Sequence, residues 1–122
     1  MNQLNVVDSS AWIEYLADTE RANLYSKVIE NSEQLIVPVI TIYEVFKKVL
    51  RENGEDLAIQ IASLMQSGQV VDLDTSLALE AAQFKLPLAD SLIYATAVRH
   101  DARLWTQDEH FDGLANVKYF PK

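Results

Sequence analysis

Four acidic residues stand where a protein could carry out metal-dependent chemistry. Asp8 directly follows a pair of β-branched residues, and Asp108 comes shortly after another apolar stretch. Glu44 and Asp90 each lie near the beginning of a segment whose apolar residues have helical spacing. The sequence contains no cysteine and two histidines, so carboxylate oxygen is its one abundant metal ligand. Oxygen ligands suit hard divalent cations, and the residue types therefore point to Mg²⁺ or Mn²⁺.

The hydrophobic pattern predicts the elements that position these acids. The expected strands are residues 4–7, 35–38, 69–73, 102–106 and 117–120, and the expected helices are residues 9–17, 19–31, 41–53, 55–66, 75–85 and 88–100. We expect Ser9 or Ser10 to cap the first helix, and Gly54 and Gly68 to end the helices before them. This alternation predicts an α/β fold, a three-layer sandwich with helices on both faces of a mostly parallel sheet of about five strands. The length favours one domain over residues 1–122.

A parallel sheet would bring the four acids together. Ligands bind outside the carboxyl ends of parallel strands, where loops and helix N-termini meet. Each of the four acids falls at a strand end or a helix beginning on that edge. Carboxylates about 4 Å apart repel one another by roughly 4 kcal/mol per pair at an effective dielectric constant of about 20. Such a cluster requires cations, and divalent ions with oxygen ligands would offset the repulsion.

Each acid also has an ordinary structural explanation. Asp8 can cap the helix that follows it, and Asp108 can form a turn. Glu44 can complete a capping box with Thr41, and Asp90 can complement the positive end of its helix. Taken one at a time, these explanations are favoured. Together they do not explain why acids gather at one edge, and Asp8 can cap its helix with one oxygen while it presents the other to a metal.

The charge distribution bears on the class of substrate. A formal net charge of −8 argues against nucleic acid on average, because phosphate backbones are normally met by basic surfaces. Lys47 and Arg51 are four residues apart and share one side of a predicted helix, so they can contact a phosphate backbone beside the acids. Scattered cations on an acidic protein more often only solvate a face. We expect His100 and His110 at the surface or at helix ends rather than in catalysis.

Other classes of protein fit the sequence less well. No apolar run is long enough to span a bilayer and the N-terminal residues do not resemble a signal peptide, so we expect a cytoplasmic protein that does not act at a membrane. A phosphoacceptor receiver domain needs two adjacent acids after its first strand and a lysine after a late strand, and this chain has neither. A phosphatase of the Asp-x-Asp type is excluded because two serines follow Asp8.

The segments that carry the acids resemble the motifs of PIN-domain ribonucleases, and within them the VapC-type toxins of toxin–antitoxin pairs. VVDSSAWIEYL resembles the first motif, VPVITIYEVFKKV the second, and LPLADSLIYATAVRHDARLWTQDEHFDGL the third and fourth together. The resemblance covers essentially the whole chain. It implies an acidic quartet that binds the metal and catalyses the reaction, and its members here are Asp8, Glu44, Asp90 and Asp108.

Two further positions bear on this resemblance. Thr106 matches the polar residue that often accompanies the fourth acid, and we expect it to take part in substrate binding. Relatives frequently have glycine before the strand that carries Thr106, whereas this chain has Asp101-Ala102. An aspartate can adopt the left-handed conformation that ends a helix, so the departure concerns only the geometry of the loop.

The resemblance implies an endoribonuclease that depends on Mg²⁺ or Mn²⁺ and hydrolyses RNA phosphodiesters with a metal-activated water. It also implies a toxin that forms a homodimer and is inactivated by a VapB-like antitoxin. Helices within residues 9–31 and 41–66 would supply an apolar surface for a partner helix. Two alternatives stay open, a housekeeping RNA-processing PIN nuclease and a PIN-like interaction module without catalysis.

Overall fold

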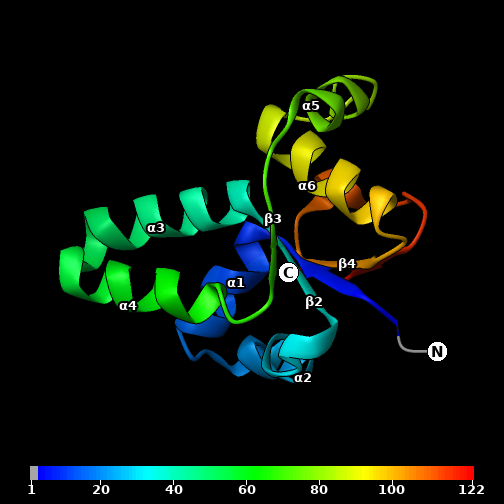
Figure 1. Ribbon diagram of the computed structural model, residues 1–122. Coiled ribbons are helices and arrows are strands. Elements are labelled where there is room, and N and C mark those ends of the chain that lie inside the picture. Colours follow the sequence, from blue (N-terminus) through cyan, green and yellow to red (C-terminus); the bar gives the residue numbers. More distant parts are fainter. Residues whose placement is uncertain (1–2) are drawn as a thin grey trace.

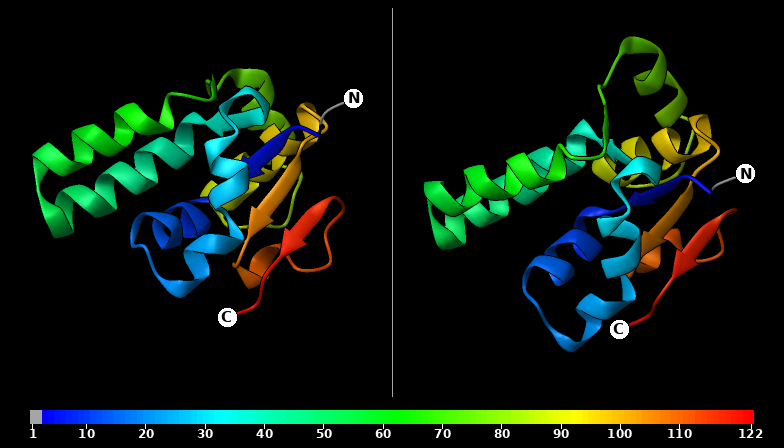
Figure 2. Two further views of the ribbon diagram at one scale, coloured as in Figure 1. Left: turned by 90° about the horizontal axis from the view of Figure 1, so that it is seen from below. Right: turned by 60° about the horizontal axis from the view of Figure 1, so that its bottom comes forward.

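The computed structural model describes residues 3–122 and shows a central sheet with helices packed against both of its faces (Figure 1, Figure 2). In chain order the elements are β1 (Asn5–Val7), α1 (Ser9–Leu16), the 3₁₀ helix η1 (Glu20–Leu24), α2 (Ser26–Glu30), the 3₁₀ helix η2 (Ser32–Gln34), β2 (Leu35–Pro38), α3 (Val39–Asn53), α4 (Glu55–Met65), β3 (Gln69–Val71), α5 (Thr75–Ala81), α6 (Leu88–Arg99), β4 (Arg103–Thr106), the 3₁₀ helix η3 (Glu109–Phe111) and β5 (Val117–Tyr119). Residues 1–2, which the predicted single domain includes, lie outside the described residues. Within residues 3–122, no helix combines the length and apolar character needed to cross a membrane.

The sheet has the strand order β3-β2-β1-β4-β5, and every neighbouring pair is parallel. The predicted α/β sandwich with a sheet of about five strands is therefore confirmed. From the central strand β1 the chain first builds β2 and β3 on one side and then β4 and β5 on the other. The order of connection thus reverses between β1 and β4. Parallel sheets form their ligand-binding crevice at such a point, outside the carboxyl ends of the strands.

Alternating side chains of the sheet supply two separate cores. Val7, Leu35 and Val37 pack with α1, α2, α3 and α4 on one face. Val6 and Ile36 pack with α6 on the other face. Because successive strand residues point to opposite faces, unbroken runs of β-branched residues bury both sides of these strands. The rigid sheet fixes where the chain leaves each strand.

The α3–α4 hairpin projects from the sheet as a two-helix arm (Figure 1). Gly54 ends α3 with a backbone φ of 92°, which confirms the prediction made for it. Gly68 does not end α4, because that helix stops at Met65. A Cβ at Gly68 would lie 2.8 Å from the carbonyl oxygen of Leu35, so this glycine permits a close approach to β2. Asp101 has a φ of 51°, the left-handed conformation expected where relatives have glycine.

Two expected helices differ from the structure. The helix expected over residues 19–31 is wrong as one unit: Thr19 caps η1, and the chain then turns at Tyr25 before α2 begins. Tyr25, at this break, is completely buried. The helix expected over residues 75–85 ends at Ala81, and Phe84 then packs edge-on against Tyr94 of α6, with ring centroids 5.0 Å apart.

Candidate functional site

Asp8 lies where β1 ends and α1 begins. It is the N-cap of α1, and its Oδ1 accepts a hydrogen bond from the backbone N–H of Ala11 at 2.9 Å. The hydroxyl of Thr106, at the end of β4, donates to Oδ2 at 2.6 Å. Burial of Asp8 raises the pKa of its carboxyl to about 6, although these hydrogen bonds favour the charged form, and the charge of Asp108 contributes to the rise. Asp8 is therefore a cap and also a perturbed acid.

The two serines after Asp8 lie within α1. The prediction that Ser9 or Ser10 caps this helix is wrong, because Asp8 holds the N-cap position. The Ser10 hydroxyl lies 2.9 Å and 3.0 Å from the two oxygens of Asp8. The second oxygen of Asp8, expected to be free for a metal, thus already accepts hydrogen bonds. Ser9 instead donates its hydroxyl to Oε1 of Glu44 at 2.5 Å.

Glu44 reaches this region from α3. The helix begins at Val39 rather than Thr41, so Glu44 lies in its second turn. Thr41 donates its hydroxyl to the carbonyl oxygen of Pro38. The capping box considered for Thr41 and Glu44 is therefore wrong, because Pro38 and not Thr41 is the N-cap residue of α3. The hydrogen bond from Ser9 holds Glu44 toward the beginning of α1.

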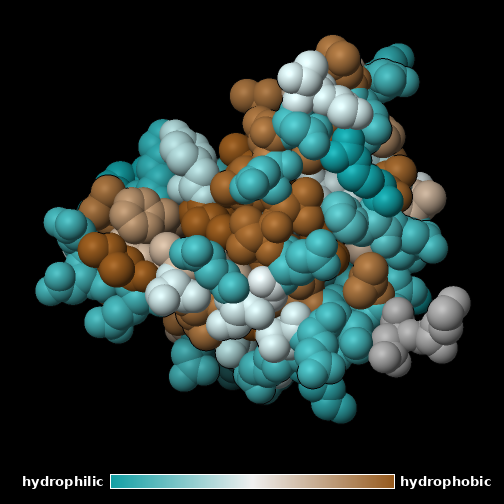
Figure 3. Space-filling view, viewed as in Figure 1, coloured by the Kyte–Doolittle hydropathy of each residue, from teal (hydrophilic) through white to brown (hydrophobic). Residues whose placement is uncertain are grey.

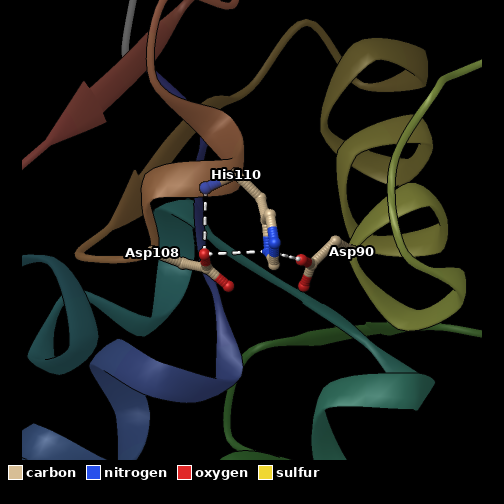
Figure 4. A group of neighbouring side chains, drawn as sticks. All are labelled: Asp90, Asp108 and His110. Atoms are coloured by element: carbon tan, nitrogen blue, oxygen red, sulfur yellow. Dashed lines mark hydrogen bonds and ion pairs between the residues drawn. The ribbon is translucent and has the colours of Figure 1, made fainter.

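Asp90 and Asp108 face each other across one histidine (Figure 4). Asp90 lies in the first turn of α6, and Asp108 caps η3 by accepting a hydrogen bond from the backbone N–H of His110 at 3.0 Å. Nδ1 of His110 lies 3.0 Å from Oδ2 of Asp90 and 3.0 Å from Oδ1 of Asp108. One ligand atom from each of the three residues lies within 4.8 Å of the other two. This is the spacing of groups that can share one cation.

Burial and neighbouring charges together shift the pKa values in this cluster. Burial raises the pKa of Asp90 to about 6, the charges of Asp108 and Glu44 add to the rise, and His110 opposes it. The charge of Asp108 is also the main cause of a raised pKa at His110. The charge of Asp108 also contributes to the raised pKa of Asp8. Carboxylates that raise one another's pKa values mark a place where an added cation lowers the free energy.

The structure thus brings the four predicted acids to one edge of the sheet, two of them in a tight group and two beside it. Asp90 and Asp108 form a tight group with His110. Asp8 and Glu44 lie beside this group rather than in it, and each is held by a serine of α1. The acids flank the point between β1 and β4 where the strand order reverses.

The three predicted substrate-binding residues occupy different positions. Lys47 and Arg51 are exposed on α3, and with Ser9, Tyr43 and Glu44 they line an open groove of about 360 Å³. Glu44 lines the same groove, so the cations there lie beside this acid, where they could meet a phosphate backbone. Thr106 is completely buried and donates to Asp8, so its position favours holding that acid over touching a substrate.

His110 is the residue of this cluster for which the sequence suggested no role. Its side chain is 53% exposed, so a surface position is correct, but the imidazole lies between two carboxylates. Its place two residues after Asp108, in a turn that Asp108 caps, is the signal that the sequence offers. That signal is weak, because the contact with Asp90 joins residues 20 apart in the chain.

Comparison with protein families gives one match, to the PIN domain, over residues 6–117. The matched region contains all four acids, the strands β2, β3 and β4, and parts of β1 and β5. The chain belongs to the PIN domain family. A search of curated proteins finds no match to this PIN domain.

Solved structures of similar fold cover nearly the whole PIN domain. A chain of a toxin–antitoxin complex from Klebsiella pneumoniae has 20% identity and a TM-score of 0.78, covering 97% of this chain and 99% of its own. A chain of DNA-bound VapBC from Salmonella typhimurium has 14% identity and a TM-score of 0.76, covering 98% of each. The Sarcin-Ricin loop cleaving toxin VapC20 of Mycobacterium tuberculosis has 15% identity and a TM-score of 0.76, covering 96% of this chain and 99% of its own. At these identities the likeness shows the shared fold.

Proposed function

We propose that this PIN domain is a divalent-metal-dependent endoribonuclease that acts as the toxin of a toxin–antitoxin pair. The observation that carries the proposal is the convergence of Asp8, Glu44, Asp90 and Asp108 at one sheet edge, where the pKa values of two of them are raised to about 6. Support comes from the fold that it shares with toxins, one of which is described as cleaving the Sarcin-Ricin loop.

The donor set fits a hard divalent cation. Carboxylate oxygens dominate it, and Asp90 and Asp108 each present an oxygen within 4.8 Å of the other, close enough for both to bind one ion. We propose that Asp90 and Asp108 hold Mg²⁺ or Mn²⁺, with Asp8 and Glu44 as further or water-mediated ligands. A bound divalent ion supplies an acidified water at neutral pH and neutralises charge on the scissile phosphate.

The chain's own residues would place the reactants. Ser9 holds Oε1 of Glu44, which leaves the second carboxylate oxygen to orient a water for in-line attack on phosphorus. Lys47 and Arg51 would contact the RNA backbone in the groove beside Glu44. Attack of water on phosphorus with the 3′-oxygen as the leaving group would give a 5′-phosphate and a 3′-hydroxyl.

A cleavage assay tests this proposal. Purified protein is incubated with a pool of structured RNAs and either Mg²⁺ or Mn²⁺, and Asp8→Asn and Asp90→Asn are compared with wild type. Asp56→Asn, an exposed acid at the beginning of α4, is the matched control. Equal cleavage by all four proteins contradicts the assignment of the site, and RNA binding without cleavage supports the interaction-module alternative.

The surfaces available to partners support the toxin assignment. An apolar groove of about 210 Å³ runs between α1 and the α3–α4 arm, and we propose that it takes an apolar segment of an antitoxin. Its lining residues are Ile13, Leu16, Ala17, Lys48, Val49, Glu52, Asn53, Leu57 and Ile61. If the chain is a toxin, its induced expression should arrest growth, and Asp90→Asn should abolish the arrest. Co-expression of an antitoxin encoded beside it should reverse the arrest. A housekeeping nuclease would show RNA cleavage without reversible arrest.

We also propose a homodimer. Hydrophobic side chains gather at the centre of one face, over β3 and between the α3–α4 arm and α5 (Figure 3). Large apolar side chains on the bordering elements are exposed, among them Tyr43, Leu73, Leu79 and Leu88. Light scattering at micromolar concentration would give twice the mass of the chain, and Leu88→Asp would return it to the mass of a monomer.

A further inference from the structure

Gln107 stands between the residue that holds Asp8 and the acid Asp108, and its side chain is buried. Thr106 before it donates to Asp8, and the backbone N–H of Asp108 after it donates to the hydroxyl of Thr106 at 2.9 Å. Gln107 is 7% exposed. A buried amide costs free energy unless its donors and acceptors are paired, so its partners show what this turn is attached to.

Those partners come from the segment that follows α1. Oε1 of Gln107 accepts hydrogen bonds from Nε of Arg21 at 3.0 Å and from the hydroxyl of Tyr25 at 3.3 Å. Nε2 of Gln107 donates to Oε1 of Glu14 at 3.0 Å. The amide thus makes three of the four hydrogen bonds open to it. Arg21 lies in η1 and Tyr25 lies at the break between η1 and α2, 86 and 82 residues from Gln107 in sequence.

The partners of Gln107 are themselves fixed. The hydroxyl of Thr19 donates to Oε2 of Glu14 at 2.5 Å. Nη2 of Arg21 donates to the carbonyl oxygen of Phe120 at 2.8 Å, and the N–H of Phe120 donates to the carbonyl oxygen of Thr106 at 2.9 Å. The turn that presents Asp108 is therefore tied on one side to α1 and η1 and on the other to the end of β5.

We infer that Gln107 is a positioning residue for the metal site, with Glu14 and Arg21 fixing its amide so that the turn presents Asp108 to the ion. The inference rests on the proposed function and deepens it. Three hydrogen bonds converge on one amide, whereas filling the space would need only an apolar side chain of equal volume. Groups that orient metal ligands commonly change metal affinity or activity by about 10-fold to 100-fold when they are replaced.

An exchange of the amide and the carboxylate tests this inference. Gln107→Glu sets two carboxylates face to face, because residue 107 can no longer donate a hydrogen bond to Glu14. The double variant Gln107→Glu/Glu14→Gln restores the pairing: the new carboxylate accepts from Arg21, Tyr25 and the new amide. Glu14→Gln alone is the matched control, because its amide oxygen can still accept from Gln107.

We expect Gln107→Glu to weaken Mn²⁺ binding about tenfold by calorimetric titration and to lower kcat about tenfold with KM for RNA unchanged. In the metal-free protein, the backbone amide resonances of Asp108 and His110 should shift. The double variant should return all of these values to within about twofold of wild type, and a purely structural role would not produce such a rescue together with an unchanged KM.

Two results would overturn the inference: Mn²⁺ affinity in Gln107→Glu equal to that of wild type, or a folded double variant that fails to recover it. If Gln107→Glu does not fold, the test rests on the double variant. Its Mn²⁺ affinity and the amide resonances of Asp108 and His110 are then compared with those of wild type. A wild-type protein that does not cleave RNA would contradict the proposed function, while the metal titrations and resonances would still decide the role of Gln107.

Discussion

The hydroxyl of Thr106 donates a hydrogen bond to Oδ2 of Asp8 at 2.6 Å and joins residues that are 98 apart in the sequence. The bond crosses from the end of β4 to the end of β1, the two strands between which the connection order reverses. It is fully buried, and it opposes the rise in pKa that burial causes at Asp8. The bond therefore helps keep the carboxylate of Asp8 ionised at a buried position that water does not solvate.

Thr106→Val removes this donor with little change of shape. We expect the free energy of unfolding at pH 7 to fall by about 2 kcal/mol, because a hydrogen bond to a buried charged group is lost. The pKa of Asp8 should rise further and metal binding should weaken. Denaturant unfolding and metal titration measure both effects. Thr106→Ser keeps the hydroxyl and is the control, so an equal loss in both variants would contradict this role.

Gly68 offers a separate test of the fold. A Cβ there would lie 2.8 Å from the carbonyl oxygen of Leu35 and 3.0 Å from Cγ2 of Val37, both in β2. Gly68→Ala should lower the free energy of unfolding by about 1 to 3 kcal/mol, because the strand or the turn must shift. Gly54→Ala meets no atom within 4 Å, so its cost should come from backbone strain alone, because a φ of 92° with a ψ of 171° suits glycine. Urea denaturation measures both variants, and an unchanged free energy of unfolding in Gly68→Ala would show that the turn can relax.

Local patterns in the sequence predicted most of the fold. Short, largely apolar stretches marked the strands, and apolar spacing marked α3, α4 and α6 to within a few residues at each end. The break at Tyr25 could not be predicted in this way, because local spacing does not report the contact that Tyr25 makes with Gln107, 82 residues away. Gly68 follows a predicted helix in the sequence, but the reason for a glycine there is its close approach to β2, more than 30 residues away.

The candidate site was predictable for a related reason. A parallel sheet gathers whatever follows its strands, so the positions of Asp8 and Asp108 were implied by topology alone. The residues that tune these acids were not implied. His110 and Gln107 act through contacts with Asp90 and Glu14, which are 20 and 93 residues away, and no local spacing reports such a distance.

The raised pKa values predict how stability depends on pH. Asp8 has an ordinary pKa of 3.8 and a pKa of about 6 in the folded protein, so the folded state holds the proton more tightly. This contribution to stability is fully present below about pH 4 and is lost as pH rises through 6. The loss amounts to about 3 kcal/mol for a shift of this size. Asp90 acts in the same direction, and its partial exposure weakens the effect.

The free energy of unfolding is measured for wild type and Asp8→Asn in the presence of a metal chelator. The contributions of the other titrating groups cancel in the difference between the two proteins. Wild type should lose stability relative to the variant between pH 4 and pH 7. Mn²⁺ should then stabilise wild type more at pH 7.5 than at pH 5, because the ion binds the ionised acids. A difference that does not change with pH would contradict the raised pKa of Asp8.

His110 should compete with the metal rather than bind it. Its imidazole lies 3.0 Å from both Asp90 and Asp108, and the charge of Asp108 raises its pKa, so near pH 6 it is a cation between the two acids. Mg²⁺ prefers oxygen ligands and must displace this charge. His110→Asn should therefore tighten Mg²⁺ binding several-fold at pH 6 and by less as the pH rises, while His100→Asn, at the end of α6, should match wild type throughout. Calorimetric titration over this pH range decides the role: weaker binding by His110→Asn at high pH would make His110 a ligand, and tighter binding that fades as the pH rises would make it the counter-ion of the metal-free site.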